Sequence, residues 1–381
     1  MIINRSFWPV NAVIGEAMLK LAEEVNKNGY SVFVVFQDKG KIKEELKKAK
    51  RGEGISFYPV KALTNSASRL ILRIIDNLFF TFLVLINLLR IRPNKIYVST
   101  DPPIFIPFVT MLYCRICGAN YVYHLQDIHP EATNVVIKIP KILFNLLKSI
   151  DTLTLKHAKS LITITEEMAQ EIQIRSNKNF PIHILSNPAI SFNNINLNKP
   201  KIAGFSFCGN AGRLQRIPLV LNAIESYIKQ GGKMRFTFAG GGIYKQKLEE
   251  FTKKFKQFKY YGLVNPEKAS KITSKYTWSL LPIEDEVTKY AFPSKTSSYV
   301  YSKTKILAIC SQGTSVANWV KKKKVGLVIS PKIDVLVRTF FNIERGIYDI
   351  KIDELLYERL NSELGLDIFV STLYRIILEQ T

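Results

Sequence analysis

Short runs of consecutive apolar residues alternate with amphipathic stretches along almost the whole chain. In the first half of the sequence these runs cover residues 32–36, 95–100, 120–124 and 161–165. Runs of this length that are rich in β-branched and aromatic residues are typical of buried strands, and the stretches between them are long enough for helices. The alternation therefore predicts an α/β architecture with parallel sheets.

The alternation is interrupted once, by a polar and turn-rich stretch at 187–200, and then resumes. Such a stretch is typical of a linker, and a chain of 381 residues is long enough for two cores. Ligands of open α/β sheets bind at the carboxyl ends of the strands, so we expect two Rossmann-like domains with parallel sheets facing across a cleft. The expected parts are an N-terminal domain at 1–188, a linker at 189–200, a C-terminal domain at 201–364, and a helix at 365–381 that can pack back towards the first domain. In the second half the predicted strands lie near 204–208, 234–239, 258–262, 277–281, 305–309 and 325–329.

Glycine and basic residues gather in three segments of the second half, at 208–216, 239–242 and 292–295. Glycine lets the backbone approach a phosphate closely, and Arg213, Arg216 and Lys295 supply fixed positive charge. Their spacing matches neither the GxGxxG fingerprint nor a GxxxxGK[ST] loop. Each segment alone is more often a simple turn, but together they predict a pocket for a diphosphate, with backbone amides at 209–212 as further donors.

The charge of the chain indicates a polyanionic partner. It carries 54 basic and 31 acidic residues, a net charge of +23. No nucleic-acid-binding motif is visible, and Lys138, Lys141, Lys148 and Lys156 lie among apolar residues, which favours an anionic membrane surface. The alternative is a genome-wide coding bias towards isoleucine, lysine and asparagine.

Two apolar features bear on location. The run at 78–89 is shorter than the roughly 20 residues that span a bilayer, so we expect a buried or interfacial helix, with burial favoured. The first residues lack the pattern of a signal peptide, and the four cysteines lack a secreted-type spacing, so we expect a reducing cytoplasm.

Metal chemistry finds little support in the sequence. Cys114 and Cys117 form a CxxC, and His129 and Glu131 an HxE, but in zinc deaminases the cysteine pair follows the HxE. No Asp-x-Asp occurs, and the four histidines have no ligand spacing. We therefore expect no metal site.

Six segments together resemble retaining glycosyltransferases of the large family four, which have two Rossmann-like domains in the arrangement called the B fold (GT-B). The bacterial members of that family build surface polysaccharides. The resemblance covers nearly the whole chain. Its segments are PheTrpProValAsnAlaValIleGlyGlu at 7–16, GlnAspIleHisProGluAla at 126–132, GlyAsnAlaGlyArgLeuGln at 209–215, AlaGlyGlyGly at 239–242, TyrTyrGlyLeuVal at 260–264 and ProSerLys at 293–295.

This resemblance implies a nucleotide-sugar donor, with a UDP-sugar expected ahead of a GDP-sugar, and no cofactor. Asp127, His129 and Glu131 would lie near the acceptor and the transferred sugar. Turn and helix-cap roles are the alternatives for His129 and Asp127, and both remain open. The residues expected at the donor are Gly209, Asn210, Gly212, Arg213, Arg216, Gly241, Tyr261, Val264, Ser294, Lys295 and Ser298.

The sequence departs from the family at the glutamates that hold the donor ribose, where it has Tyr290 and Ser298. Ribose recognition therefore cannot be transferred from the family, and Glu284, Asp285 and Glu286 are possible substitutes. Fixed cations would stabilise the leaving diphosphate, and retention needs no strong base if the leaving phosphate accepts the acceptor proton.

The resemblance implies transfer to an undecaprenyl-diphosphate-linked glycan in O-antigen or capsule synthesis, at the inner face of the cytoplasmic membrane. Two alternatives stay open. One is a nucleotide-sugar epimerase of related fold, although no histidine follows His183. The other is a membrane-associated binding protein with a decayed site.

Overall fold

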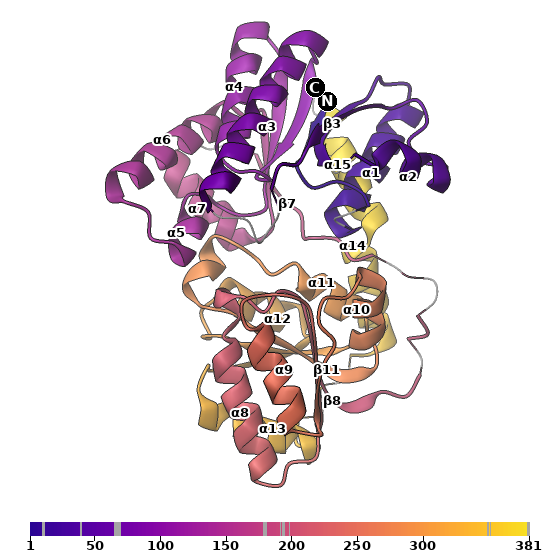
Figure 1. Ribbon diagram of the computed structural model, residues 1–381, viewed down its shortest axis with the longest axis vertical. Helices are drawn as coiled ribbons and strands as arrows, with labels where there is room; N and C mark the ends of the chain where they lie inside the picture. The colour runs from indigo at the N-terminus through magenta and orange to yellow at the C-terminus, as the bar shows by residue number, and fades with distance from the viewer. Residues whose placement is uncertain are drawn as a thin grey trace. The chain divides into compact units, whose positions relative to one another are not determined.

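The computed structural model divides the chain into two compact units, and each unit has its own sheet (Figure 1). Unit 1 comprises Met1–Pro188 and Leu366–Thr381, and unit 2 comprises Ala189–Gly365. Parts of the 7–16 motif, of the expected linker and of the C-terminal segment lie outside the described residues. The structure describes residues 1–9, 12–38, 40–64, 70–177, 181–190, 192, 195–197, 199–348, 350 and 352–378.

Unit 1 contains a seven-stranded parallel sheet with the order β3-β2-β1-β4-β5-β6-β7. The strand order reverses between β1 and β4, and such a switch point is where open α/β sheets bind ligands. The four strands predicted in this half are all present. The strands are β1 (Ile2–Ile3), β2 (Phe33–Asp38), β3 (Ser56–Lys61), β4 (Lys95–Ser99), β5 (Asn120–Leu125), β6 (Ser160–Thr163) and β7 (Ile182–Ile184).

Helices cover both faces of this sheet. On one face α1 and α15 pack together over alternate strand residues that include Tyr97 and Val122. The neighbours of Val122 point the other way, as a strand requires, and there Tyr123 meets α6 through Asp151. Helices α3, α4 and α6 neighbour one another in that order on this second face (Figure 1). The helices of the unit are α1 (Ala12–Lys27), α2 (Ile42–Ala49), α3 (Leu70–Ile91), α4 (Phe105–Cys117), α5 (Glu131–Val136), α6 (Lys141–His157), α7 (Glu166–Ser176) and α15 (Leu366–Leu378).

Helix α3 differs from the expectation for the 78–89 run. It has 22 residues, and within the described residues its segment Ile71–Ile91 is long and apolar enough, by length and composition, to cross a membrane. Only 28% of its most apolar window is buried. A single stripe of Phe80, Val84 and Leu88 packs into the unit, at the four-residue spacing of one helix face. The expected burial therefore holds for that stripe and is wrong for the rest of the helix.

Unit 2 repeats the architecture with a six-stranded parallel sheet in the order β10-β9-β8-β11-β12-β13. All six strands predicted in this half are present, and the order reverses between β8 and β11. The strands are β8 (Ile202–Cys208), β9 (Arg235–Ala239), β10 (Phe258–Tyr260), β11 (Tyr276–Pro282), β12 (Lys305–Ile309) and β13 (Gly326–Ile329).

The two faces of this sheet differ in chemistry. One is an aromatic core in which Phe205 stacks on Phe236 and Phe207 on Phe238, beneath α8 and α13. The other carries small polar residues, and the Ser206 and Ser279 hydroxyls lie 2.9 Å apart there. The helices are α8 (Ile217–Lys229), α9 (Lys245–Lys254), α10 (Pro266–Thr273), α11 (Lys295–Tyr301), α12 (Ser315–Lys323), α13 (Ile333–Glu344) and α14 (Glu354–Leu364), with short 3-10 turns η1 (Arg213–Gln215) and η2 (Glu286–Lys289).

Candidate active site

Two glycine-containing loops, one after β8 and one after β9, are joined by backbone hydrogen bonds at the carboxyl edge of the unit 2 sheet. The Gly209 N–H donates to the Ala239 carbonyl at 2.9 Å, and the Ala211 N–H donates to the Gly241 carbonyl at 2.7 Å. Gly240 has φ +132°, and a Cβ there would lie 1.9 Å from the Gly209 carbonyl oxygen. The glycines are therefore required first for the contact between the loops.

Most amides of the first loop already have partners inside the protein. Besides those of Gly209 and Ala211, the Gly212 N–H donates to the Gln215 side chain at 3.0 Å. Among the four amides at 209–212 that we expected to bind a diphosphate, only that of Asn210 has no recorded partner. The loop thus offers one free amide, at an exposed residue, instead of a cradle of four.

The side chain of Lys295 is the strongest feature of this edge. Its ammonium lies 4.2 Å from the ring centroid of Phe207, and a Cβ on Gly209 would lie 3.0 Å from its Nζ. The side chain is half-buried, and burial lowers its pKa to about 8. Among the described residues no carboxylate or carbonyl is recorded as its partner. A partly desolvated cation with no counter-charge is suited to bind an anion.

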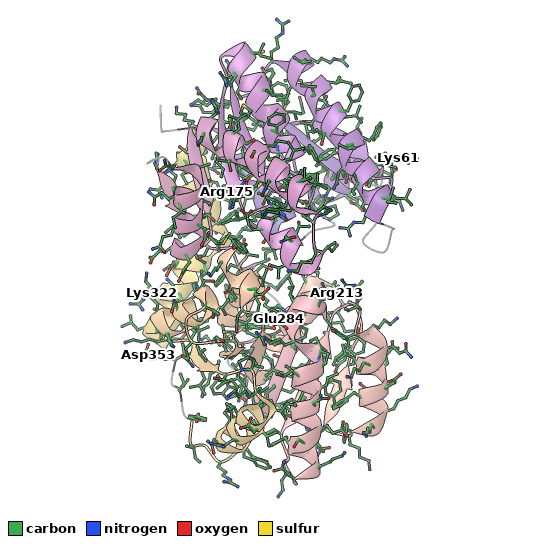
Figure 2. The ribbon with its side chains drawn as sticks, turned by 90° about the vertical axis from the view of Figure 1, so that its left-hand side faces the viewer. Lys61, Arg175, Arg213, Glu284, Lys322 and Asp353 are labelled. Carbon is green, nitrogen blue, oxygen red and sulfur yellow. The ribbon has the colours of Figure 1, made fainter. Side chains whose placement is uncertain are left out.

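The two arginines of the first loop differ from each other. Arg213 is exposed, and within the described residues no hydrogen bond or ion pair is recorded for it. Arg216 donates to the Ile283 carbonyl at 2.7 Å and pairs with Glu284 at 3.0 Å and Asp285 at 3.2 Å. It therefore connects the loop after β8 to the loop after β11, across the switch point. Figure 2 labels Arg213 and Glu284, which both belong to this unit.

The residues expected around the base and ribose are spread over this edge. Tyr261 is partly exposed, with the ammonium groups of Lys259 and Lys268 at 4.7 and 5.6 Å from its ring centroid. Val264 packs instead into a small apolar cluster with Cys208. Ser294 is exposed and precedes α11, and Ser298 lies one turn further along that helix, half-buried.

In unit 1, Asp127 follows β5 and lies near the switch point of its sheet. Its backbone N–H contacts the Thr100 hydroxyl at 3.4 Å, and no partner is recorded for its carboxylate among the described residues. Burial, helped by the nearby charge of Asp101, raises the pKa of Asp127 to about 6. Asp101 itself pairs with Arg5 at 2.8 Å and accepts the Ser6 N–H at 3.0 Å. Asp127 is thus the carboxyl group here that can exchange a proton near neutral pH.

His129 lies two residues further on and is neutral. Its Nδ1 lies 2.9 Å from the Thr133 hydroxyl, and burial together with the charge of Arg175 lowers its pKa to about 4. A neutral imidazole at pH 7 offers one donor and one acceptor nitrogen. His129 can therefore position a phosphate or sugar hydroxyl without carrying charge.

Glu131 is part of a buried ion-pair network and is not open to a substrate. It is 8% exposed, and its two oxygens pair with Lys148 and Arg175, both at 3.1 Å. Arg175 also binds Asp151 at 2.7 Å, and it donates to the carbonyl of His129 at 2.8 Å. Arg175, labelled in Figure 2, belongs to unit 1, and its side chain is 5% exposed. We expected Glu131 near the acceptor, but its contacts give it the role of fixing the 127–131 loop.

Arg175 and Arg5 were not expected at the site. Arg175 lies 44 positions beyond Glu131, and Arg5 lies in a different strand connection from Asp101, so no local motif joins them. For Arg5 the available signal was its position shortly after the end of β1, whereas Arg175 lies within α7 and gave no such signal.

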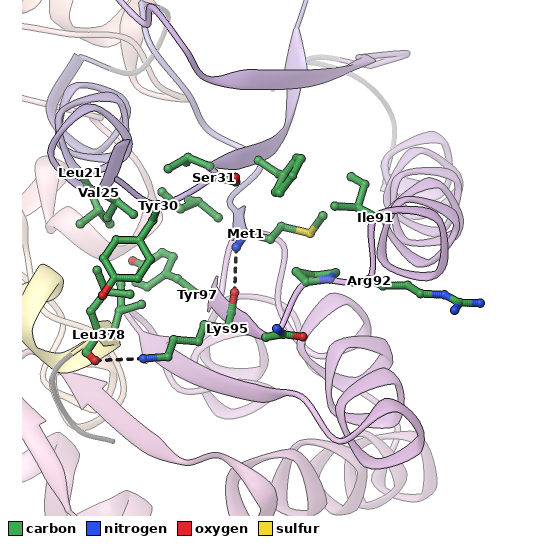
Figure 3. A pocket seen from close by; sticks show the side chains of 16 residues that line it. Met1, Leu21, Val25, Tyr30, Ser31, Ile91, Arg92, Lys95, Tyr97 and Leu378 are labelled. Atoms are coloured by element: carbon green, nitrogen blue, oxygen red, sulfur yellow. Dashed lines mark hydrogen bonds between the residues drawn. The ribbon is translucent and has the colours of Figure 1, made fainter. Parts of the chain in front are cut away.

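An apolar cavity of unit 1 lies away from these residues, at the amino ends of β1 and β4 (Figure 3). It has a volume of about 360 Å³ and is lined by residues that include Met1, Val25, Tyr30 and Tyr97. The N-terminal amine of Met1 donates to the Lys95 carbonyl at 2.8 Å. Because Asp101 and Asp127 follow the carboxyl ends of β4 and β5, this cavity and the candidate site belong to opposite edges of the sheet.

No cluster of three His, Cys, Asp or Glu side chains that could hold a metal occurs in the part of the chain that is described.

Comparisons with known proteins confirm the fold. No family model matches the chain. The probable glycosyltransferase WbjE of Pseudomonas aeruginosa is 23% identical over 281 residues, which are 69% of each chain. The lipopolysaccharide outer core galactosyltransferase WaaB superposes with a TM-score of 0.66 at 13% identity, over 100% of this chain and 99% of WaaB. HepE of Anabaena in complex with UDP gives 0.65 at 12% identity, over 99% of both chains. The expected GT-B architecture is therefore present.

Proposed function

We propose that this protein is a glycosyltransferase that moves a sugar from a nucleotide-diphosphate donor to a lipid-linked oligosaccharide. The observation that carries the proposal is the half-buried side chain of Lys295, which lies against Gly209 at the switch point of unit 2 and has no anionic partner among the described residues. The name of WbjE and the UDP bound to HepE support the same reading.

The donor diphosphate is bound by fixed cations in this proposal. Lys295 and Arg213 neutralise its oxygens, and the free amide of Asn210 adds a hydrogen bond. Arg216 acts indirectly, because its pairing with Glu284 and Asp285 holds the neighbouring loop. A divalent metal is not needed, and UDP is the expected nucleotide.

Transfer then proceeds at the anomeric carbon with retention. The acceptor hydroxyl oxygen forms the new bond to that carbon, the bond to the diphosphate oxygen breaks, and the acceptor proton passes to the leaving phosphate. Asp127, ionised above pH 6, orients the acceptor hydroxyl, while neutral His129 donates a hydrogen bond to the sugar or phosphate. The sugar is a hexose or an N-acetylhexosamine.

The proposed acceptor is an undecaprenyl-diphosphate-linked glycan of O-antigen or capsule synthesis. The likeness of the fold to WaaB, an enzyme of lipopolysaccharide, supports this class of product. Such an acceptor is held in a bilayer, so the enzyme works as a peripheral protein at the cytoplasmic face of the membrane.

The first test is to measure the Kd of the protein for UDP by calorimetry, with EDTA present to remove divalent metals. Replacing both Lys295 and Arg213 removes two charge-assisted contacts, so the Kd for UDP should rise at least about 100-fold. The matched control is Lys253→Met, which removes an exposed charge from α9. Unchanged UDP binding by K295M/R213A contradicts the pocket, and binding that requires a metal contradicts the cationic mechanism.

Transfer itself is tested with labelled UDP-sugars and extracted membrane lipid as the acceptor. We expect label in the lipid fraction, with the anomeric configuration of the donor preserved in the NMR spectrum of the released glycan. An inverted configuration contradicts retention, and label in water-soluble products alone contradicts the lipid-linked acceptor.

A further inference from the structure

Three neighbouring helices of unit 1 expose large apolar side chains to solvent. On α3, Phe82 is 59% exposed, and Leu78 and Ile86 lie on the same side one turn away in each direction. Ile116 of α4 is 81% exposed, and Ile142 of α6 is 87% exposed. Since α4 contacts both α3 and α6, these helices form one surface, which we call the α3–α4–α6 face (Figure 1). Soluble proteins rarely expose so many large apolar groups together without a partner.

Helix α3 is fixed to the sheet along its inner side. Asp76, 3% exposed, accepts hydrogen bonds from the Gln37 side chain at 3.1 Å and the Thr64 hydroxyl at 2.6 Å. Asn77 accepts another from Arg5 at 3.0 Å. A helix that crossed a bilayer would have to give up these bonds and bury Asp76 in hydrocarbon. The helix therefore stays in the unit, with only its outer side available to a partner.

The charges of this face have one sign. The acidic residues of α3, α4 and α6 are Asp76 and Asp151, and both are buried. The charged residues that these helices expose, such as Arg73, Arg90 and Lys141, are all cationic. Helix α9 of unit 2 contrasts with them, because it mixes lysines with Glu249 and Glu250. An apolar surface with basic residues alone around it complements an anionic lipid surface.

We propose that the α3–α4–α6 face docks onto an anionic lipid bilayer, with its apolar side chains at the level of the headgroups and acyl chains and its arginines and lysines at the phosphates. Unit 1 then sits on one leaflet and does not cross it. A second copy of the chain is a poorer occupant, because a twofold pairing of this face would bring the same cationic set against itself.

The experiment is flotation of the full chain with vesicles of phosphatidylcholine, with or without phosphatidylglycerol. Arg90→Gln with Lys141→Gln removes two charges, each worth about 1 kcal/mol near an anionic surface, so binding at low salt should fall roughly 30-fold. Phe82→Gln with Ile142→Gln should remove the binding that remains at high salt. The matched control is Lys47→Gln with Lys48→Gln. It also removes two exposed lysine charges, but from α2, where Glu44 is exposed as well.

Equal binding by the control and the face variants overturns the proposal, as does an absence of preference for phosphatidylglycerol. A dimer that forms without vesicles and is lost in F82Q/I142Q assigns the face to a second copy instead. Circular dichroism and UDP binding of each variant establish that it is folded. Since flotation needs no donor, its failure leaves the proposed transferase standing, and a failure of UDP binding leaves the docking surface standing.

Discussion

Lys295 is the single side chain on which the proposed donor site depends most. Burial holds its pKa near 8, so the free protein has a cation there below that pH and a neutral amine above it. We expect the Kd for UDP to rise as the pH increases from 7 to 9, with proton uptake on binding near pH 8. Calorimetry in buffers of different ionisation enthalpy measures both. Lys295→Arg keeps its charge over this range, so an identical pH dependence in that variant assigns the effect elsewhere.

The ionisation of Asp127 should determine how kcat/KM falls on the acidic side of the pH–rate profile. With its pKa raised to about 6, kcat/KM should fall tenfold per unit as the pH drops below 6, and Asp127→Asn should give a low rate that is flat from pH 5 to 7. His129→Gln is the control and should keep this decrease, because His129 is already neutral at pH 5. If the decrease of kcat/KM below pH 6 persists in D127N, the group that titrates is not Asp127.

The same pKa has a consequence for stability. The folded state holds the Asp127 proton more tightly than the unfolded chain, whose aspartate pKa is about 3.9. The free energy of unfolding therefore decreases as the pH rises from about 4 to about 6 and stays lowered above that. Asp127→Asn should be more stable than the natural protein at pH 7, which chemical denaturation can measure.

At the level of elements, the 127–131 loop depends on a helix far along the chain. Arg175 of α7, 5% exposed, ties the loop to α6 through Glu131, Asp151 and the His129 carbonyl. Arg175→Met leaves the buried Asp151 without a cation and Glu131 with Lys148 alone, and it should cost about 3–5 kcal/mol in the free energy of unfolding. Urea denaturation measures this cost. UDP binding by R175M should be unchanged, since Arg175 belongs to unit 1, and a stability near that of the natural protein would contradict the network.

The glycine loops of unit 2 offer a matched pair. Gly240→Ala would place a Cβ 1.9 Å from the Gly209 carbonyl oxygen at φ +132°, so the two loops must separate. Gly241→Ala meets only the tip of Leu263 at 3.8 Å. We expect G240A to lower stability by about 1–3 kcal/mol and to weaken UDP binding, and G241A to leave stability unchanged. Thermal unfolding with and without UDP compares the two variants. If both lower the stability equally, the contact between the two loops is not what requires Gly240.

The sequence predicts elements well where strands are central and apolar. Most of the ten strands that we predicted are buried runs of β-branched and aromatic residues, whereas β1, β3 and β7 were not predicted. β1 has two residues, β7 has three, and β3 is an edge strand with Pro59 and exposed Ser56. Helix α3 begins earlier than the predicted apolar run. Asp76 interrupts the apolar pattern in the sequence, but hydrogen bonds from Gln37 and Thr64 satisfy its carboxylate, so the helix continues through it.

Side-chain roles were less predictable than elements. Glu131 and Arg216 have residue types that fit a ligand, yet both are engaged in ion pairs with residues distant in the sequence, Arg175 and Glu284. Composition and spacing identify groups that can bind an anion, but a partner 44 or more positions away is set by topology. The lack of an anionic partner for Lys295 within the described part of the chain is likewise visible only once the fold is known.

For the molecule as a whole, the division into two units predicts where a nucleotide acts. Hydrogen exchange with UDP should show protection at 209–213, 239–242 and 293–298, all in unit 2. Helix α15 is joined directly to unit 2 at Gly365 but belongs to unit 1, so its exchange should not respond. Mass spectrometry of peptic fragments measures both regions. Protection confined to unit 1 would contradict the assignment of the donor to unit 2.

The path of the chain makes unit 2 an insertion. The chain leaves unit 1 after Pro188 and returns at Leu366, and the first and last residues of the inserted block, Ala189 and Gly365, pair in a β-bridge. The Ala189 N–H also donates to the Leu364 carbonyl at 2.8 Å. A block whose ends are neighbours can be replaced in one event without rerouting its host. Evolution, or an engineer, can therefore exchange unit 2, the proposed nucleotide-binding part, while the α3–α4–α6 face and the loops of unit 1 remain as they are.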